Sequence, residues 1–292
     1  MPQAYQNPKA VILDIEEKAK LLDEITKYQI VIEYFEGYKD VLKTIDGIVP
    51  IVGLLLNSKN ISDVQECLDL FTVLHKLRIS SSKEGIRKML TLIMRPEASI
   101  KKKVIETFQS LYFKENTEES QAELLVDLAL ELDYSEYECL KELLKSLITN
   151  KDIHMTLFKE IWRIAMKNPE TSFENLKDNE DEYNEKCTQM ENECLAALKI
   201  INISSEFEPM IITTQVDYYL RNVNGHLKRK NICWLAIKEG LYGLQKIHYL
   251  KKDETERCLV KITKTLFRGY GTPNNQWFLV AKELISTIFQ IM

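Results

Sequence analysis

The chain has 292 residues, of which 45% are hydrophobic and 28% charged, with a net charge of −5 and a pI near 5.6. That length and hydrophobic content support a sizeable core and exclude a wholly disordered chain, and the acidic balance excludes a globally basic nucleic-acid-binding protein. A polyanionic partner would therefore have to meet a local basic patch. The low content of Gly (9) and Pro (7) favours long helices over short strands and tight turns.

Apolar residues recur with the 3.6-residue period of amphipathic helices along nearly the whole chain, and we find no run of period-two alternation. The first predicted helix opens after Pro8 and fades at Gly37, and Ser62 or Asp63 is placed to cap the third. The predicted helices cover residues 10–38, 45–58, 61–77, 85–94, 99–113, 121–132, 134–148, 152–167, 184–204, 207–223, 227–247, 254–270 and 275–291.

The predicted helix pairs start at a nearly regular interval. Their first residues lie near Asp46, Lys83, Glu119 and Asp152, which are 37, 36 and 33 residues apart. Two-helix solenoid repeats have periods of roughly 34–47 residues. The sequence thus predicts an all-α fold, an α-solenoid of HEAT-like antiparallel helix pairs, with residues 1–292 forming a single solenoid segment. Because its last predicted helix is apolar and lacks a polar cap, we expect the segment to be part of a longer protein.

One stretch at about 168–185 departs from this pattern. It carries seven acidic residues against the single base Lys177 and has few aliphatic side chains. Such a composition is typical of a solvated loop inserted within a helix pair. An exposed spacer and a binding segment both remain open as roles for it.

The residues that catalysis usually requires are missing or scattered. The sequence holds no phosphate-binding loop and no G-x-S-x-G motif, and its four histidines lie far apart. Its six cysteines form no C-x-x-C pair, which is typical of small buried side chains in a reducing compartment. The chain start lacks a secretory pattern, and the longest apolar run, Ile48 to Leu56, is too short to cross a bilayer. We therefore expect an intracellular protein that is not an enzyme and has no cofactor, metal site or membrane segment.

Three basic clusters are the candidates for a functional surface. In chain order they are Lys101, Lys102 and Lys103 behind Arg95; Lys228, Arg229 and Lys230 beside Arg221 and His226; and, more weakly, Lys246, His248, Lys251 and Lys252. Side-chain ammonium groups give sequence-independent affinity for the phosphates of nucleic acids. The sequence therefore predicts DNA or acidic-partner contacts at Lys101–Lys103 and at Lys228–Lys230.

The triplet Lys101–Lys103 also has a structural interpretation. Consecutive helical residues point about 100° apart, so three lysines in a row cannot share one face. Lysines near a helix N-terminus oppose the macrodipole, a small cost that a purely structural role does not explain. A solvated helix face and a contact with DNA or an acidic partner both stand as interpretations of the triplet at this point. Trp162, Trp234 and Trp277 sit in apolar helical stripes, and we expect each to pack in the core.

Several segments, taken in order, resemble a known family. "ISDVQECLDLFTVLHKLRI" followed by residues 85–113 resembles the middle portion of condensin complex subunit 1, the large HEAT-repeat subunit that is not an SMC protein. The resemblance continues collinearly through residues 124–148, 157–166, 193–220, 227–244 and 259–291. The residues that carry it are Ser62, Asp63, Val64, Glu66, Phe71, Gly85, Arg87, Met89, Leu90, Leu92, Ile100, Lys101, Val104, Glu106, Leu111, Tyr112, Phe113, Glu208 and Pro209.

The resemblance implies a non-catalytic scaffold in the condensin complex. It implies binding of the kleisin subunit, the heads of the SMC ATPase subunits and double-stranded DNA during mitotic chromosome condensation, and a location in the nucleus and on chromosomes, with the cytoplasm in part of the cell cycle. It also makes Lys101 part of the family pattern, so that Lys102 and Lys103 carry the DNA hypothesis. The alternative is a generic HEAT or armadillo-type adaptor that binds a peptide partner and no DNA.

Overall fold

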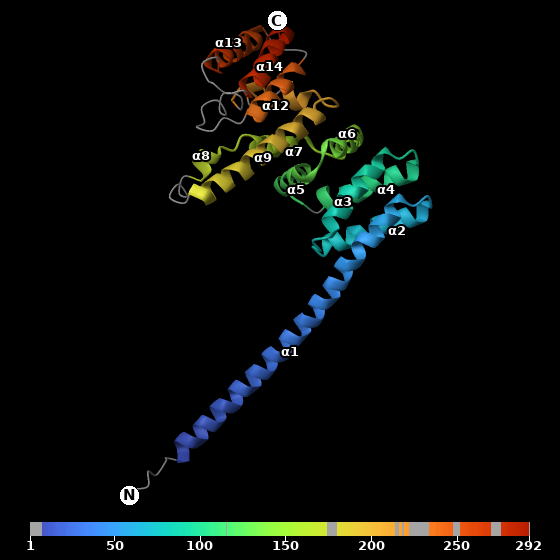
Figure 1. Ribbon diagram of the computed structural model, residues 1–292, viewed down its shortest axis with the longest axis vertical. Coiled ribbons are helices and arrows are strands. Elements are labelled where there is room, and N and C mark those ends of the chain that lie inside the picture. The colour runs from blue at the N-terminus through green and yellow to red at the C-terminus, as the bar shows by residue number, and fades with distance from the viewer. Residues whose placement is uncertain are drawn as a thin grey trace.

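The protein was analysed as a computed structural model, in which residues 8–114, 116–173, 180–213, 216–217, 219–221, 234–247, 252–269 and 276–291 are described. Every regular element within these ranges is a helix, and the predicted all-α fold is confirmed. Figure 1 shows one long helix, α1, projecting from a stack of shorter helices that follow one another in chain order.

The helices of the N-terminal half are α1 (Pro8–Gly53), α2 (Ile61–Lys76), α3 (Ser82–Thr91), α4 (Ala98–Phe108), α5 (Glu118–Glu131) and α6 (Tyr134–Thr149). Those of the C-terminal half are α7 (Met155–Ala165), α8 (Pro169–Ser172), α9 (Glu180–Ser204), α10 (Met210–Thr213), α12 (Trp234–Gln245), α13 (Lys252–Gly269) and α14 (Gln276–Ile291). Short elements extend three of them: the 3₁₀ turns η1 (Leu54–Asn57) and η2 (Leu92–Met94), and the π-helical turn η3 (Gln109–Phe113).

The helices contact near neighbours in the sequence. Helix α2 packs on α3 and α4, α3 on α6, α5 on α7 and α9, α9 on α12, and α12 and α13 on α14. Packing that moves steadily along the chain is the pattern of a solenoid, in which each repeat buries its apolar face against the next. Helices α3, α5 and α7 begin at Ser82, Glu118 and Met155, that is 36 and 37 residues apart, close to the predicted interval.

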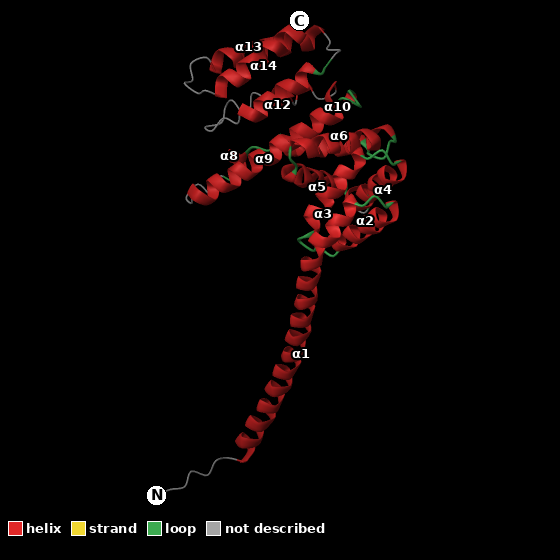
Figure 2. Cartoon of the chain, turned by 45° about the vertical axis from the view of Figure 1, so that its right-hand side comes forward, coloured by secondary structure: helices red, strands yellow, loops and turns green. Residues whose placement is uncertain are grey.

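Helix α1 departs from the prediction because it runs unbroken for 46 residues. Neither Gly37 nor Asp46 marks a boundary in it, since a single glycine inside a helix costs only about 1 kcal/mol and does not end it. Only its last turns join the stack, where Val49 is buried and Leu42 and Ile45 pack against the core. Figure 2, turned by 45° from the first view, shows the rest of α1 standing clear of the stack.

Two predicted boundaries need correction. Helix α2 is capped by Asn60, whose side-chain oxygen accepts a hydrogen bond from the backbone N–H of Ser62 at 3.1 Å, and not by Ser62 or Asp63. The expected acidic loop at about 168–185 is helical at both ends, in α8 and in the first turns of α9, and residues 174–179 lie outside the described ranges. The acidic residues Glu180–Glu182 fill the first turn of α9, where the helix dipole favours negative charge.

The core confirms most predictions on single residues. Trp162 and Trp234 are buried, and the Trp162 ring meets the fully buried Tyr219 ring edge-on at 4.5 Å. Trp277 has no described side chain. Four cysteines are buried, Cys187 is half-buried and Cys233 lies outside the described residues. Burial raises the pKa of the Cys67 thiol to about 11, which fits a small apolar core residue.

Candidate functional site

The three lysines of the first basic cluster point in three directions, and two of them serve the packing of the solenoid. The Lys101 ammonium lies 2.7 Å from a carboxylate oxygen of Glu142 on α6, and the hydrogen bond from Lys101 lowers the pKa of that carboxyl. The Lys103 ammonium lies 2.7 Å from a carboxylate oxygen of Asp69 on α2. These pairs join α4 to α2 and to α6.

Lys102 is the exposed member of the triplet. Its side chain is 78% exposed, and its one ion pair with a described residue is a long contact of 3.8 Å with Glu106, one turn along α4. A pair of that length between exposed side chains contributes little. Lys101 and Lys103 thus pair with carboxylates of other helices, which the sequence did not reveal, whereas Lys102 is exposed. A contact of the triplet with DNA or an acidic partner stays a prediction.

Two other basic residues of the predicted clusters hold parts of the stack together. The Arg95 guanidinium donates to the carbonyl oxygen of Ser58 at 3.0 Å and ties the α3–α4 break to the η1 turn. The Lys246 ammonium donates to the carbonyl oxygen of Asn202 and pairs with Glu206, at 2.8 and 2.7 Å. Predicted contacts outside the described residues are Lys228, Arg229, Lys230, His226, His248 and Lys251.

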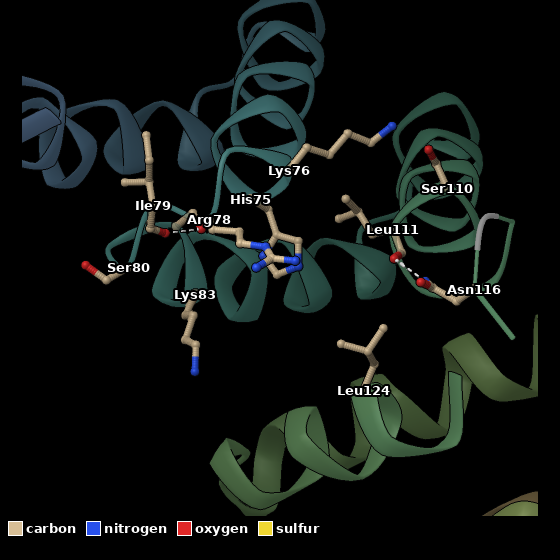
Figure 3. Close-up of a pocket in the computed structure, with 11 residues that line it drawn as sticks. His75, Lys76, Arg78, Ile79, Ser80, Lys83, Ser110, Leu111, Asn116 and Leu124 are labelled. Carbon is tan, nitrogen blue, oxygen red and sulfur yellow. Dashed lines mark hydrogen bonds between the residues drawn. The ribbon is translucent and has the colours of Figure 1, made fainter. Parts of the chain in front are cut away.

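A basic cavity that sequence reasoning missed lies beside the turn between α2 and α3. Its volume is about 640 Å³, within the usual range of ligand pockets, and it is drawn in Figure 3. Four parts of the chain line it. The end of α2 and the turn after it contribute His75, Lys76, Arg78, Ile79 and Ser80, and the start of α3 contributes Ser82 and Lys83. The η3 turn contributes Ser110 and Leu111, followed by Asn116 and by Leu124 of α5.

The cations that line this cavity differ in whether a carboxylate pairs with them. The Lys83 ammonium lies 3.3 Å from a carboxylate oxygen of Glu131, and in Figure 3 it points toward the helix that carries Leu124. Lys76 and Arg78 have no carboxylate within ion-pair distance among the described residues, and none of the residues that line the cavity is acidic. The cavity therefore presents two uncompensated positive charges.

Arg78 holds an uncommon backbone conformation. Its φ is +58°, and the hydrogen bonds from Arg78 N–H to the His75 carbonyl and from Ile79 N–H to the Leu74 carbonyl close a Schellman motif at the end of α2. Glycine is the usual residue at such a position, because a side chain in the left-handed region costs about 1 kcal/mol. The arginine kept there is one of the residues that line the cavity, and its side chain is labelled in Figure 3.

His75 and the η3 turn form a fixed wall. The His75 ring stacks on Tyr112, with centroids 6.3 Å apart, and Tyr112 stacks on Phe108 at 5.5 Å. Burial, with a smaller effect of Lys83, lowers the pKa of His75, so the ring is neutral at pH 7. The Asn116 side chain donates to the carbonyl oxygens of Leu111 and Tyr112, at 3.2 Å each, which closes the π-helical turn.

The described ranges hold neither a cluster of metal ligands nor a candidate membrane span. No group of three or more metal-ligating side chains occurs there. No helix in the same ranges has the length and apolar character needed to cross a bilayer. The signal for the basic cavity was present in "HKLRISSSK", where cations flank a run of three serines around a turn, but the sequence does not show that η3 and α5 contribute to its lining.

Comparison with known proteins shows which family this solenoid resembles. Condensin complex subunit 1 of Xenopus laevis is 22% identical over 307 aligned residues, which cover 99% of this chain and 21% of the relative. The chain is similar to condensin complex subunit 1. The human subunit is 20% identical over 51% of the chain, and the condensin-1 complex subunit CAP-D2 of Arabidopsis thaliana is 20% identical over 85%. The predicted resemblance to condensin subunit 1 is confirmed, and the first of these alignments reaches nearly the whole chain.

The chain matches only a small part of each condensin relative. The chain spans about a fifth of the length of the Xenopus subunit and 16% of that of the Arabidopsis subunit. No family model matches the chain. A crystal structure of an engineered protein covers 83% of the chain at 12% identity with a TM-score of 0.30, a likeness too low to support an argument.

Proposed function

We propose that this chain is a non-catalytic scaffold segment of a condensin complex that acts in mitotic chromosome condensation, in the nucleus and on chromosomes. The observation that carries the proposal is the sequence similarity to condensin complex subunit 1 along 99% of the chain. The stacked helix pairs support it, because a solenoid offers a long surface on which an extended segment of a partner can lie.

The partners that follow from this proposal are the kleisin subunit, the SMC ATPase heads and double-stranded DNA. Within the described residues, Lys102 is an exposed cation that is available for DNA phosphates. The ATPase activity would belong to the SMC subunits, and this chain would position them. No enzymatic role is proposed for the chain itself, which fits the scattered histidines of its sequence.

The experiment is a pull-down with the full chain as bait and the purified kleisin and SMC head fragments of the same organism as prey. A stoichiometric complex with the kleisin that persists at 0.3 M salt supports the proposal. Absence of both partners, together with binding of an unrelated peptide ligand, would instead identify a generic HEAT-type adaptor. Equilibrium binding to a 30-base-pair duplex at several salt concentrations tests the DNA contact separately, because phosphate contacts give a steep salt dependence.

A further inference from the structure

The basic cavity beside the α2–α3 turn has the chemistry of a site for a phosphate monoester. We propose that it binds a phosphorylated serine or threonine side chain of a partner protein. This inference goes beyond the scaffold role and holds whether or not the chain joins a condensin complex. It rests on the cavity, its cations and the conformation of Arg78.

The first argument is the charge of the lining. Lys76, Arg78 and Lys83 line the cavity without an acidic side chain among its described lining residues, and Lys83 alone has a carboxylate partner. A phosphoserine side chain carries a charge of about −1.5 to −2 and three acceptor oxygens. A phosphate group can therefore pair with more of these cations than an Asp or Glu side chain, which carries a single negative charge.

The second argument is the set of donors. The planar guanidinium of Arg78 can donate two parallel hydrogen bonds to two phosphate oxygens. The hydroxyl groups of Ser80 and Ser110 line the same space and make no side-chain hydrogen bond to another described residue, whereas Ser82 donates to the Ile79 carbonyl at 2.5 Å. The cavity thus offers free hydroxyl donors beside its free cations.

The third argument is shape, and it favours a side chain over duplex DNA. The cations lie around a hollow of about 640 Å³ with apolar walls at Ile79, Leu111 and Leu124. Duplex DNA follows rows of cations on exposed surfaces, because its phosphates lie on the outside of a stiff rod. A hollow with an apolar wall fits one phosphorylated side chain and the methylene or methyl group that carries it.

The backbone conformation of Arg78 has a counterpart elsewhere in the chain, which supplies a control for the proposal. The same Schellman motif with a basic residue in the left-handed region occurs at the end of α6, where Lys151 has a φ of +63° and the Asp152 N–H bonds the Leu147 carbonyl. Both basic residues also face the negative end of a helix dipole. Lys151 does not line the cavity, which makes it a matched control.

The test uses the full chain and a fluorescein-labelled seven-residue Gly/Ser peptide with one central phosphoserine. Versions with Ser or Glu at the central position serve as reference probes. We expect the phosphopeptide to bind about tenfold or more tightly than either, and Arg78→Gly to weaken it by about tenfold. Lys151→Gly, which removes the same kind of backbone strain and one positive charge elsewhere, should leave the affinity unchanged.

Three results would overturn the proposal. The first is that the phosphopeptide binds no better than the Glu version, or not at all. The second is that Arg78→Gly and Lys151→Gly change the affinity equally. The third is that a 30-base-pair duplex displaces the phosphopeptide and Arg78→Gly weakens duplex binding by the same factor, which would make the cavity a DNA phosphate contact. Thermal unfolding of both glycine variants confirms folding, since each relieves a left-handed side chain and should melt no lower than the parent chain.

Discussion

The Lys103 ammonium on α4 and the Asp69 carboxylate on α2 lie 2.7 Å apart and bridge two helices that run side by side. The pair assigns Lys103 to the packing of the stack. Replacing it by Glu sets two carboxylates against each other across the interface. We expect Lys103→Glu to lower the free energy of unfolding by about 1 kcal/mol, measured by urea denaturation, because a partly exposed pair is lost and a repulsion replaces it.

Lys102→Glu provides the contrast. Lys102 is exposed and reaches only Glu106, so the change adds one like-charge pair on a helix surface and should cost less than 0.5 kcal/mol. If the triplet contacts DNA, this variant weakens duplex binding and flattens its salt dependence while the stability is kept. Equal losses of stability in the two variants would contradict the division of the triplet into a structural and an exposed part.

Gly85 of α3 lies directly against the ring of Phe71 on α2. A Cβ added at Gly85 would stand 2.0 Å from the nearest ring carbon, and Phe71 is fully buried. We expect Gly85→Ala to destabilise the protein by about 1–3 kcal/mol, since a packed core yields only by shifting the ring. Gly47→Ala on α1 is the control, because nothing lies within 4 Å of its added Cβ. A Gly85→Ala chain as stable as the control would show that Phe71 is free to move.

Much of the fold could be predicted from the sequence, because the apolar period and the polar breaks are local signals. The break at Pro96 separates α3 from α4 as expected, and repeat starts near Lys83 and Glu119 were correct within a residue. The continuity of α1 could not be predicted in this way. Gly37 weakens a helix without ending it, and Pro50 is tolerated inside α1.

The candidate site was less predictable, because its residues come together only through packing. A run of lysines in the sequence does not show that Lys101 pairs with Glu142, 41 residues later, or that Lys103 pairs with Asp69, 34 residues earlier. Likewise, His75 and Arg78 face Leu124 because α5 follows the η3 turn across the end of α2. Charge patterns reveal cations, whereas the carboxylates that neutralise them are set by the tertiary structure.

The N-terminal part of α1 should be dispensable for the stability of the stack. Its large apolar side chains are exposed, as in Tyr34 at 70% and Phe35 at 62%, and Figure 2 shows this part of the helix standing clear of the stack. Removal of residues 1–38 should therefore leave the thermal midpoint unchanged within about 2 °C, because no buried surface is lost. A fall of more than 5 °C would show that α1 packs on part of the chain in solution. Sedimentation velocity on both chains checks that self-association does not mask the comparison.

Glu206, in the turn after α9, joins three parts of the stack through two lysines. Its carboxylate oxygens lie 2.5 Å from the Lys141 ammonium of α6 and 2.7 Å from the Lys246 ammonium at the end of α12. Burial raises the pKa of Glu206, but the hydrogen bonds from Lys141 and Lys246 lower it by more, so it lies below the usual value. We expect Glu206→Gln to lower the free energy of unfolding at pH 7 by about 1 kcal/mol.

The pH dependence of this loss follows from the lowered pKa of Glu206. A carboxyl whose pKa is lower in the folded chain stabilises it above the unfolded pKa, about 4.3, and loses that contribution as the pH falls through the folded pKa. The stability difference between the parent chain and Glu206→Gln should therefore be constant from pH 7 to 5 and shrink toward pH 3. Glu123→Gln is the control, because Glu123 is exposed on α5 and forms no ion pair with another described residue. A difference that stays the same at pH 3 would mean that Glu206 acts through its shape and neutral hydrogen bonds and not through its charge.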